Sequence, residues 1–296
     1  MPKVAFGRLN RRASEAGQDT LQMRSLKEDF GQLLDLRETR GAFQGREWVA
    51  ADLEYDASGD FAMGVLGFVE EELFRQLDES AFSWRKGETL EAVGATQHTM
   101  APFAVDLRED RRWIGFVVRR DIRHRMFANS LSVVLTDSAA RAGQIPLEWE
   151  IDLVATEESV AAWLDRNPEI KRMTRIIKFP NPAIDFDEER KDMQKLAART
   201  RQIVDTPYRG RYLSIPAAGG ERNQYLEGVS EGYLEIRFDA DSVAGRIQFS
   251  TATHGERFTI DTYGDDLELG MRYVLDAVRE FSLRRGRGPG EDGKPL

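Results

Sequence analysis

The chain has 296 residues, no cysteine and a formal charge of −9 at pH 7. Its hydrophobic fraction of 41% and charged fraction of 31% are those of a folded protein, which excludes a disordered chain. Without cysteine it forms no disulfide, thiolate zinc site or cysteine nucleophile, and a reducing cytoplasm is the expected compartment. The sequence has no apolar run near the roughly 20 residues that a membrane-spanning helix needs.

The first 20 residues are expected to form a short strand and a mobile arm, and the first half then continues with a helix and a β-rich region. Ser25 and Glu28 match a capping box, and the apolar residues that follow predict a helix over 26–36. Residues 48–55 and 61–68, separated by turn residues, predict a hairpin. The other elements predicted before residue 143 are a helix over 69–79 and strands near 101–107, 113–119 and 130–136.

The second half contains the clearest pattern. Apolar and acidic residues alternate over 147–153, which predicts a half-buried strand, and a short helix and a strand over 170–179 follow. This strand–helix–strand unit predicts two parallel neighbours joined by a crossover. Later elements are expected to be a helix over 187–204, a long loop over 206–230, strands over 233–238, 245–250 and 257–263, and a closing helix capped by Asp265 or Asp266.

These patterns together predict an α+β fold with mixed sheets, a strand–helix–strand unit and a C-terminal helix. The break in pattern from Gly143 to Pro146 predicts a boundary between two domains. The first domain would be a β-rich α+β unit over 1–143, and the second an α+β unit over 144–285. Residues 286–296 are rich in glycine, proline and charge and are predicted to form a disordered tail.

Motifs for nucleotide hydrolysis, nicotinamide binding and serine hydrolase chemistry are missing from the sequence, so we predict no cofactor and no catalytic residue. The three histidines lie far apart in the sequence and favour no metal site. One enzyme alternative stays open. Asp152, Glu169 and Lys171 match the residue types of a Mg²⁺-dependent nuclease, in which two carboxylates hold the metal and a lysine polarises the attacking water.

Basic residues are dense between positions 108 and 125, where only three acidic residues oppose them. An arginine side chain suits phosphate because its planar fork donates two hydrogen bonds to one anion and stays charged. This segment therefore predicts a nucleic-acid contact, with a salt-bridged surface or a protein–protein contact as the alternatives. The residues of the candidate site are Arg108, Arg111, Arg112, Arg119, Arg120, Arg123 and Arg125.

A second basic group could extend the same face. It lies on the predicted strand that closes the strand–helix–strand unit and consists of Lys171, Arg172, Arg175 and Lys178. A basic stripe of Lys191, Lys195 and Arg199 on the predicted helix after it could also contribute, although such stripes are commonly only solvated.

The basic strand over 172–179, the Pro180-Asn181-Pro182 end and the charged helix after it resemble the RexA-type phage-exclusion proteins. The order of the predicted elements also resembles that family. The resemblance implies a cytoplasmic homodimer that binds double-stranded DNA with little sequence preference. It also implies that the protein acts as the sensor for a membrane-embedded effector protein. The main hypothesis is thus a nonspecific DNA-binding protein of antiviral defence, and a nuclease or a protein–protein adaptor are the alternatives.

Overall fold

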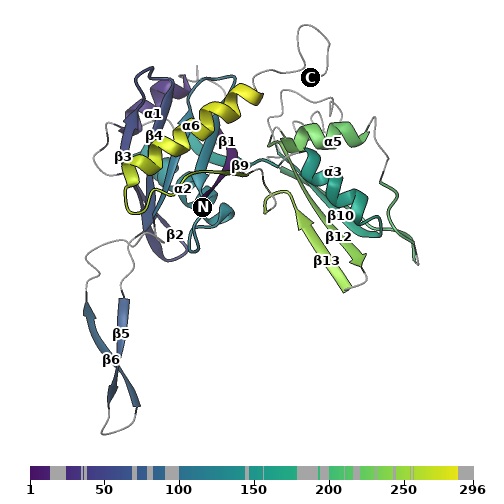
Figure 1. The fold of residues 1–296 in the computed structure, drawn as a ribbon, viewed down its shortest axis with the longest axis horizontal. Helices are drawn as coiled ribbons and strands as arrows, with labels where there is room; N and C mark the ends of the chain where they lie inside the picture. The colour runs from purple at the N-terminus through teal and green to yellow at the C-terminus, as the bar shows by residue number, and fades with distance from the viewer. Residues whose placement is uncertain are drawn as a thin grey trace. The chain divides into compact units, whose positions relative to one another are not determined.

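The computed structural model describes residues 1–13, 25–34, 36, 39–68, 72–78, 83–90, 100–143, 147–155, 157–178, 193, 200–209, 211–215, 221–230, 232–242, 245–253, 255 and 257–285. The fold is α+β, with mostly antiparallel sheets and a C-terminal helix (Figure 1), as predicted.

The chain divides into two compact units. Unit 1 consists of Met1–Val4, Arg11–Glu150 and Thr259–Leu296, and unit 2 consists of Ala5–Asn10 and Ile151–Phe258. This division differs from the expected boundary near residue 143, because the last helix belongs to the unit formed by the first half of the chain. The physical reason is that this helix packs against strands of the first half rather than against the strands that precede it.

One large sheet has the strand order β14-β1-β8-β7-β4-β3-β2, and β9 also pairs with β1. Three of these strands, β1, β9 and β14, contribute residues to both units. The strands are β1 (Lys3–Ala13), β2 (Arg40–Phe43), β3 (Arg46–Tyr55), β4 (Phe61–Phe68), β7 (Met100–Asp106), β8 (Trp113–Val117), β9 (Leu147–Leu153) and β14 (Arg257–Thr259).

The central strands β4, β7 and β8 are buried on both faces. Their cover comes from the helices α2 (His124–Arg141) and α6 (Leu267–Arg285). The ring of Phe116 stacks on that of Phe127 of α2, with the ring centres 3.9 Å apart. The ring of Trp113 contacts that of Phe281 of α6, with the ring centres 5.2 Å apart. Because side chains three positions apart on a strand point to opposite faces, the two helices cover opposite faces of β8.

The helix α1 (Leu26–Leu34) begins with the predicted capping box. The hydroxyl of Ser25 accepts a bond from the Glu28 N–H at 3.2 Å, and the Glu28 carboxylate accepts one from the Ser25 N–H at 2.8 Å. The N-cap of α6 is likewise confirmed, since the Asp266 carboxylate accepts a bond from the Leu269 N–H at 2.9 Å.

Two predicted elements of unit 1 are wrong. Residues 72–78 of the predicted helix form strand β5 (Glu72–Asp78), which pairs with β6 (Ser83–Leu90) and with no other described strand. The predicted strand over 130–136 lies inside α2. Its apolar residues continue a helical spacing from Phe127 through Leu131 and Val134, so packing on the sheet favours a helix there.

Unit 2 contains a four-stranded antiparallel sheet in the order β11-β10-β12-β13. Two helices pack on one face of it, and Trp163 of the first stacks on Phe238 of β12. On β12, Glu235, Arg237 and Asp239 alternate with the core residues and lie on the other face. The elements are α3 (Glu157–Arg166), β10 (Ile170–Lys178), β11 (Thr200–Asp205), α5 (Glu221–Ser230), β12 (Leu234–Ser242) and β13 (Gly245–Ser250).

Four predictions for this half need correction or fall outside the description. The strands β9 and β10 belong to different sheets, so they are not the expected parallel neighbours. Residues 200–204 form a strand instead of the end of a helix, and α5 lies within the predicted loop. The basic stripe Lys191, Lys195 and Arg199 lies outside the described residues. The prediction for β13 is confirmed over Gly245–Ser250.

Candidate nucleic-acid interface

The arginine segment does not form one cluster. The strand β8 separates it into a group in the β7–β8 turn (Arg108, Arg111 and Arg112) and a group that runs from the end of β8 into the first turn of α2 (Arg119, Arg120, Arg123 and Arg125). Five residues of strand at about 3.3 Å each place the two groups at least roughly 17 Å apart. The fold therefore gives each group its own surroundings, which decide what it can bind.

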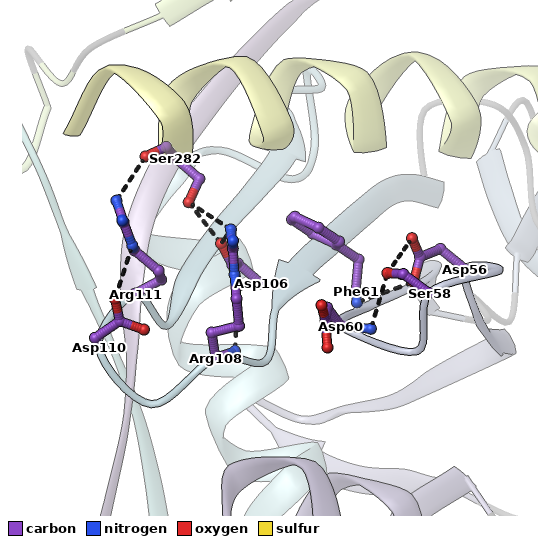
Figure 2. A network of polar contacts seen from close by, with 9 residues as sticks. All are labelled: Asp56, Ser58, Asp60, Phe61, Asp106, Arg108, Asp110, Arg111 and Ser282. Atoms are coloured by element: carbon purple, nitrogen blue, oxygen red, sulfur yellow. Dashed lines mark hydrogen bonds and ion pairs between the residues drawn. The ribbon is translucent and has the colours of Figure 1, made fainter. Parts of the chain in front are cut away.

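The first group is held within unit 1 by a buried carboxylate. Arg108 donates two bonds to Asp106, at 2.8 and 2.5 Å, and a third at 3.1 Å to the hydroxyl of Ser282 on α6 (Figure 2). Asp106 is fully buried, and it also accepts a bond from the Ser282 hydroxyl at 2.6 Å. The bond to Asp106 raises the pKa of Arg108 above its ordinary value. This arginine therefore serves to attach α6 to the sheet.

Arg111 completes the attachment. Its side chain donates at 2.9 Å to the backbone carbonyl of Ser282 and at 3.0 Å to Asp110. That carbonyl lies in the last turn of α6, where helix carbonyls lack internal partners and a cation is favourable. Arg112 adopts a left-handed backbone conformation at φ 55° and is half-buried.

A neighbouring network holds the middle of α6 in the same way. The side chain of Asp56 accepts bonds from the hydroxyl of Ser58 and, at 3.1 Å, from the N–H of Phe61 (Figure 2), and it pairs with Arg279 of α6 at 2.8 Å. Burial tends to raise the pKa of Asp56, but the bonds from Ser58, Phe61 and Arg279 outweigh it and lower the pKa below the ordinary value.

The second group is more exposed. Arg119 is engaged, because its guanidinium bonds to the Tyr263 hydroxyl and lies 5.1 Å from the centre of that ring. Arg120, Arg123 and Arg125 are exposed. The side chains of Arg120 and Arg123 make no hydrogen bond or ion pair in the part of the chain that the structure describes. We call Arg120, Arg123 and Arg125 the α2 arginines.

Of the α2 arginines, Arg120 lies in the turn before an 18-residue helix, Arg123 is its N-cap and Arg125 lies in its first turn. Arg123 occupies the N-cap position with an extended backbone and makes no side-chain cap bond, and the first turn contains no acidic residue. Positive side chains at a helix N-terminus oppose the helix dipole, and they leave backbone N–H groups open to an anion. Basic side chains and a positive helix end thus coincide, and such an arrangement suits phosphate.

The predicted residues of β10 are partly engaged within unit 2. Lys171 lies 3.4 Å from Asp241, Arg175 pairs with Asp205 at 2.9 Å, and Lys178 pairs with the buried Asp152. Arg172 is exposed. Of the predicted cations on this strand, Arg172 is therefore the most accessible.

The three residues of the nuclease alternative have separate partners. Asp152 bonds to Asn10 at 2.7 Å and to Lys178, not to Lys171. Glu169 forms a hydrogen bond with the side chain of Tyr212. Among the described residues, no group of three carboxylates or histidines is placed to hold a metal ion.

The loop predicted over 206–230 contains a feature to which the sequence-based prediction assigned no role. Tyr208 and Tyr212 are exposed, and they flank the exposed Arg209 and Arg211. The available signal was the sequence Tyr-Arg-Gly-Arg-Tyr, in which aromatic and basic residues are interleaved.

No protein-family model matches the chain, and no curated protein matches it either. None of the helices in the described residues is long and apolar enough to cross a membrane.

Proposed function

We propose that the protein binds double-stranded DNA without sequence preference, with the α2 arginines as phosphate contacts. The observation that supports this best is the coincidence of three exposed arginines with a helix N-terminus that has no side-chain cap. Phosphate contacts carry no sequence information, so binding through them is nonspecific. Because the whole chain has a charge of −9, attraction to DNA requires such a local basic site.

The test is a gel-shift titration of a duplex at several salt concentrations. Replacing Arg120 and Arg123 with glutamate should weaken binding at least tenfold, because both are exposed and lack a partner in the described structure. The slope of log affinity against log salt should fall by about 1.8, since each lost phosphate contact removes about 0.9. Arg119 is left in place because its bond to Tyr263 makes it part of the fold.

The matched control replaces the exposed Arg257 and Arg272 with glutamate, which changes the charge by the same amount. This control should retain most of the affinity and the full salt slope. Equal weakening in both variants would mean that total charge, not the α2 site, governs binding. Unchanged affinity in the Arg120 and Arg123 variant would refute the site.

The proposal extends to a cytoplasmic homodimer that acts as the DNA sensor of a membrane-embedded effector, as the resemblance to the RexA-type proteins implies. The dimer is tested by light scattering, which should give twice the chain mass of 33.7 kDa. A mass of one chain at micromolar concentration would contradict the dimer, and it would leave the DNA-binding test unaffected.

A further inference from the structure

Tyr208, Arg209, Arg211 and Tyr212 of unit 2, which we call the tyrosine turn, form a segment that presents aromatic rings to solvent. The side chain of Tyr208 is 86% exposed and that of Tyr212 is 42% exposed. The N–H of Arg211 donates to the Tyr208 carbonyl at 3.0 Å, which closes a turn with Arg209 inside it. Both of these arginines are exposed. Two aromatic rings and two cations therefore share one short exposed segment.

The second half of this turn is fixed to the sheet. The N–H of Leu213 donates to the Ile170 carbonyl at 2.8 Å, so the backbone is attached at the start of β10. The ammonium of Lys171 lies 4.4 Å from the centre of the Tyr212 ring. A hydrogen bond to Glu169 is the main cause of a raised pKa of the Tyr212 hydroxyl. The ring is thus held in position before any ligand arrives, which lowers the entropy lost on binding.

The chemistry of the tyrosine turn matches nucleic acid. Aromatic rings stack on bases, and neighbouring arginines and lysines attract the phosphates that join them. The exposed Arg172 adds a further cation on β10. The nearby carboxylates Glu169 and Asp241 are already engaged, the first by Tyr212 and the second by Lys171.

We propose that the tyrosine turn stacks on unpaired bases, so that the protein prefers DNA in which base faces are exposed. Bases in an intact duplex cover one another, and a tyrosine ring reaches their faces only where pairing is disrupted. The inference rests on the proposed DNA binding and adds the form of DNA that is recognised. It assigns backbone contact to the α2 arginines and base contact to the tyrosine turn.

The experiment measures the affinity of the full chain by fluorescence anisotropy for three probes of equal length. They are a paired duplex, the same duplex with a central bubble of mismatched thymines, and a single strand. The bubble should bind about tenfold more tightly than the duplex, in line with the contribution of one stacked base. Tyr208→Ala should abolish this preference and leave duplex affinity unchanged, whereas Tyr208→Phe should retain it.

The Tyr208 substitutions are suitable because the ring is 86% exposed, so its removal should not affect folding. The Arg120 and Arg123 variant is the second control. It should weaken binding to duplex and bubble by the same factor, because it removes phosphate contacts alone.

Each outcome decides between the two proposals. Equal affinity for duplex and bubble would overturn the tyrosine-turn inference and leave the proposed function standing. Binding to bubble and single strand alone, lost in Tyr208→Ala, would support the inference and overturn duplex binding as the function. A preference for the bubble that persists in Tyr208→Ala would overturn the inference. The lack of binding to any of the three probes would overturn both proposals.

Discussion

Replacing Arg123 with aspartate should stabilise the protein and weaken its binding to DNA. Arg123 stands at the N-cap of α2 with φ −81° and ψ 170°, the extended conformation from which a short side chain bonds the first free N–H groups. Arginine makes no such bond here. The present residue is therefore a poor choice for the helix, and a role in binding an anion would explain it.

The size of the effect follows from two contributions. An aspartate N-cap contributes about 1 kcal/mol relative to residues that do not cap. Replacing a positive by a negative charge at the helix N-terminus adds about 0.5 kcal/mol. The free energy of unfolding of unit 1 should thus rise by about 1.5 kcal/mol, which corresponds to an increase in Tm of about 3–6 °C.

The assay combines thermal unfolding with a gel shift on the same preparations. Arg123→Ser is the intermediate variant, since it supplies a cap without a negative charge, and Arg257→Asp reverses the charge of an exposed arginine elsewhere. We expect Tm to rise in both Arg123 variants, and affinity to fall most in Arg123→Asp. A decrease in Tm would refute the reasoning about the helix end. Stronger or unchanged DNA binding would refute its role as a phosphate site.

Ser282→Ala should lower the Tm of unit 1 by about 4–8 °C, because it removes a hydrogen bond to the charged Asp106 that is worth about 2 kcal/mol. Ser130→Ala is the control and should not lower the Tm, since the buried Ser130 hydroxyl has no hydrogen-bond partner in the described structure. The wild-type protein should lose stability below about pH 4, because the carboxylate of Asp56, whose pKa is lowered in the folded state, stabilises the fold only while it is ionised. Asp56→Asn should reduce this loss of stability at low pH. Tyr263→Phe should reduce the loss of stability above about pH 10, because burial raises the pKa of Tyr263 in the folded state, as unfolding followed against pH would show. Asp152→Ala should cost about 3–5 kcal/mol in urea unfolding, because it removes the buried carboxylate that pairs with Lys178, and a cost below about 1 kcal/mol would contradict that role.

Predictions that depend on neighbouring residues in the sequence agree with the structure. Ser25 and Glu28 complete a capping box within four residues, and Asp266 caps the closing helix three residues before its bonded N–H. The hairpin of β3 and β4 is similarly local, because its two strands are neighbours in the sequence and the turn residues between them are visible there. In each case the residues that determine the structure are close together in the sequence.

Predictions that depend on residues far apart in the sequence are the ones that differ from the structure. The segment over 130–136 has the apolar content of a buried strand, but α2 lies on a sheet whose aromatic residues complement a helical face. The strand β9, in the middle of the chain, pairs with β1 near the N-terminus, which no local pattern indicates. The same limit applies to the site, since the partner of Arg108 on α6 is 174 residues away.

The charge of an arginine contributes to binding only where its own protein leaves it unneutralised. Arg108 faces a fully buried carboxylate at hydrogen-bond distance, so the field of one largely cancels that of the other outside the protein. Arg120 and Arg123 have no such partner among the described residues, and a helix dipole adds to their field. A count of basic residues treats all of these side chains alike, whereas their partners separate those that attach α6 from those that we propose as phosphate contacts. Replacing Arg108 should accordingly lower the stability of unit 1 and leave the salt slope of DNA binding unchanged, which is the reverse of the effect expected for Arg120.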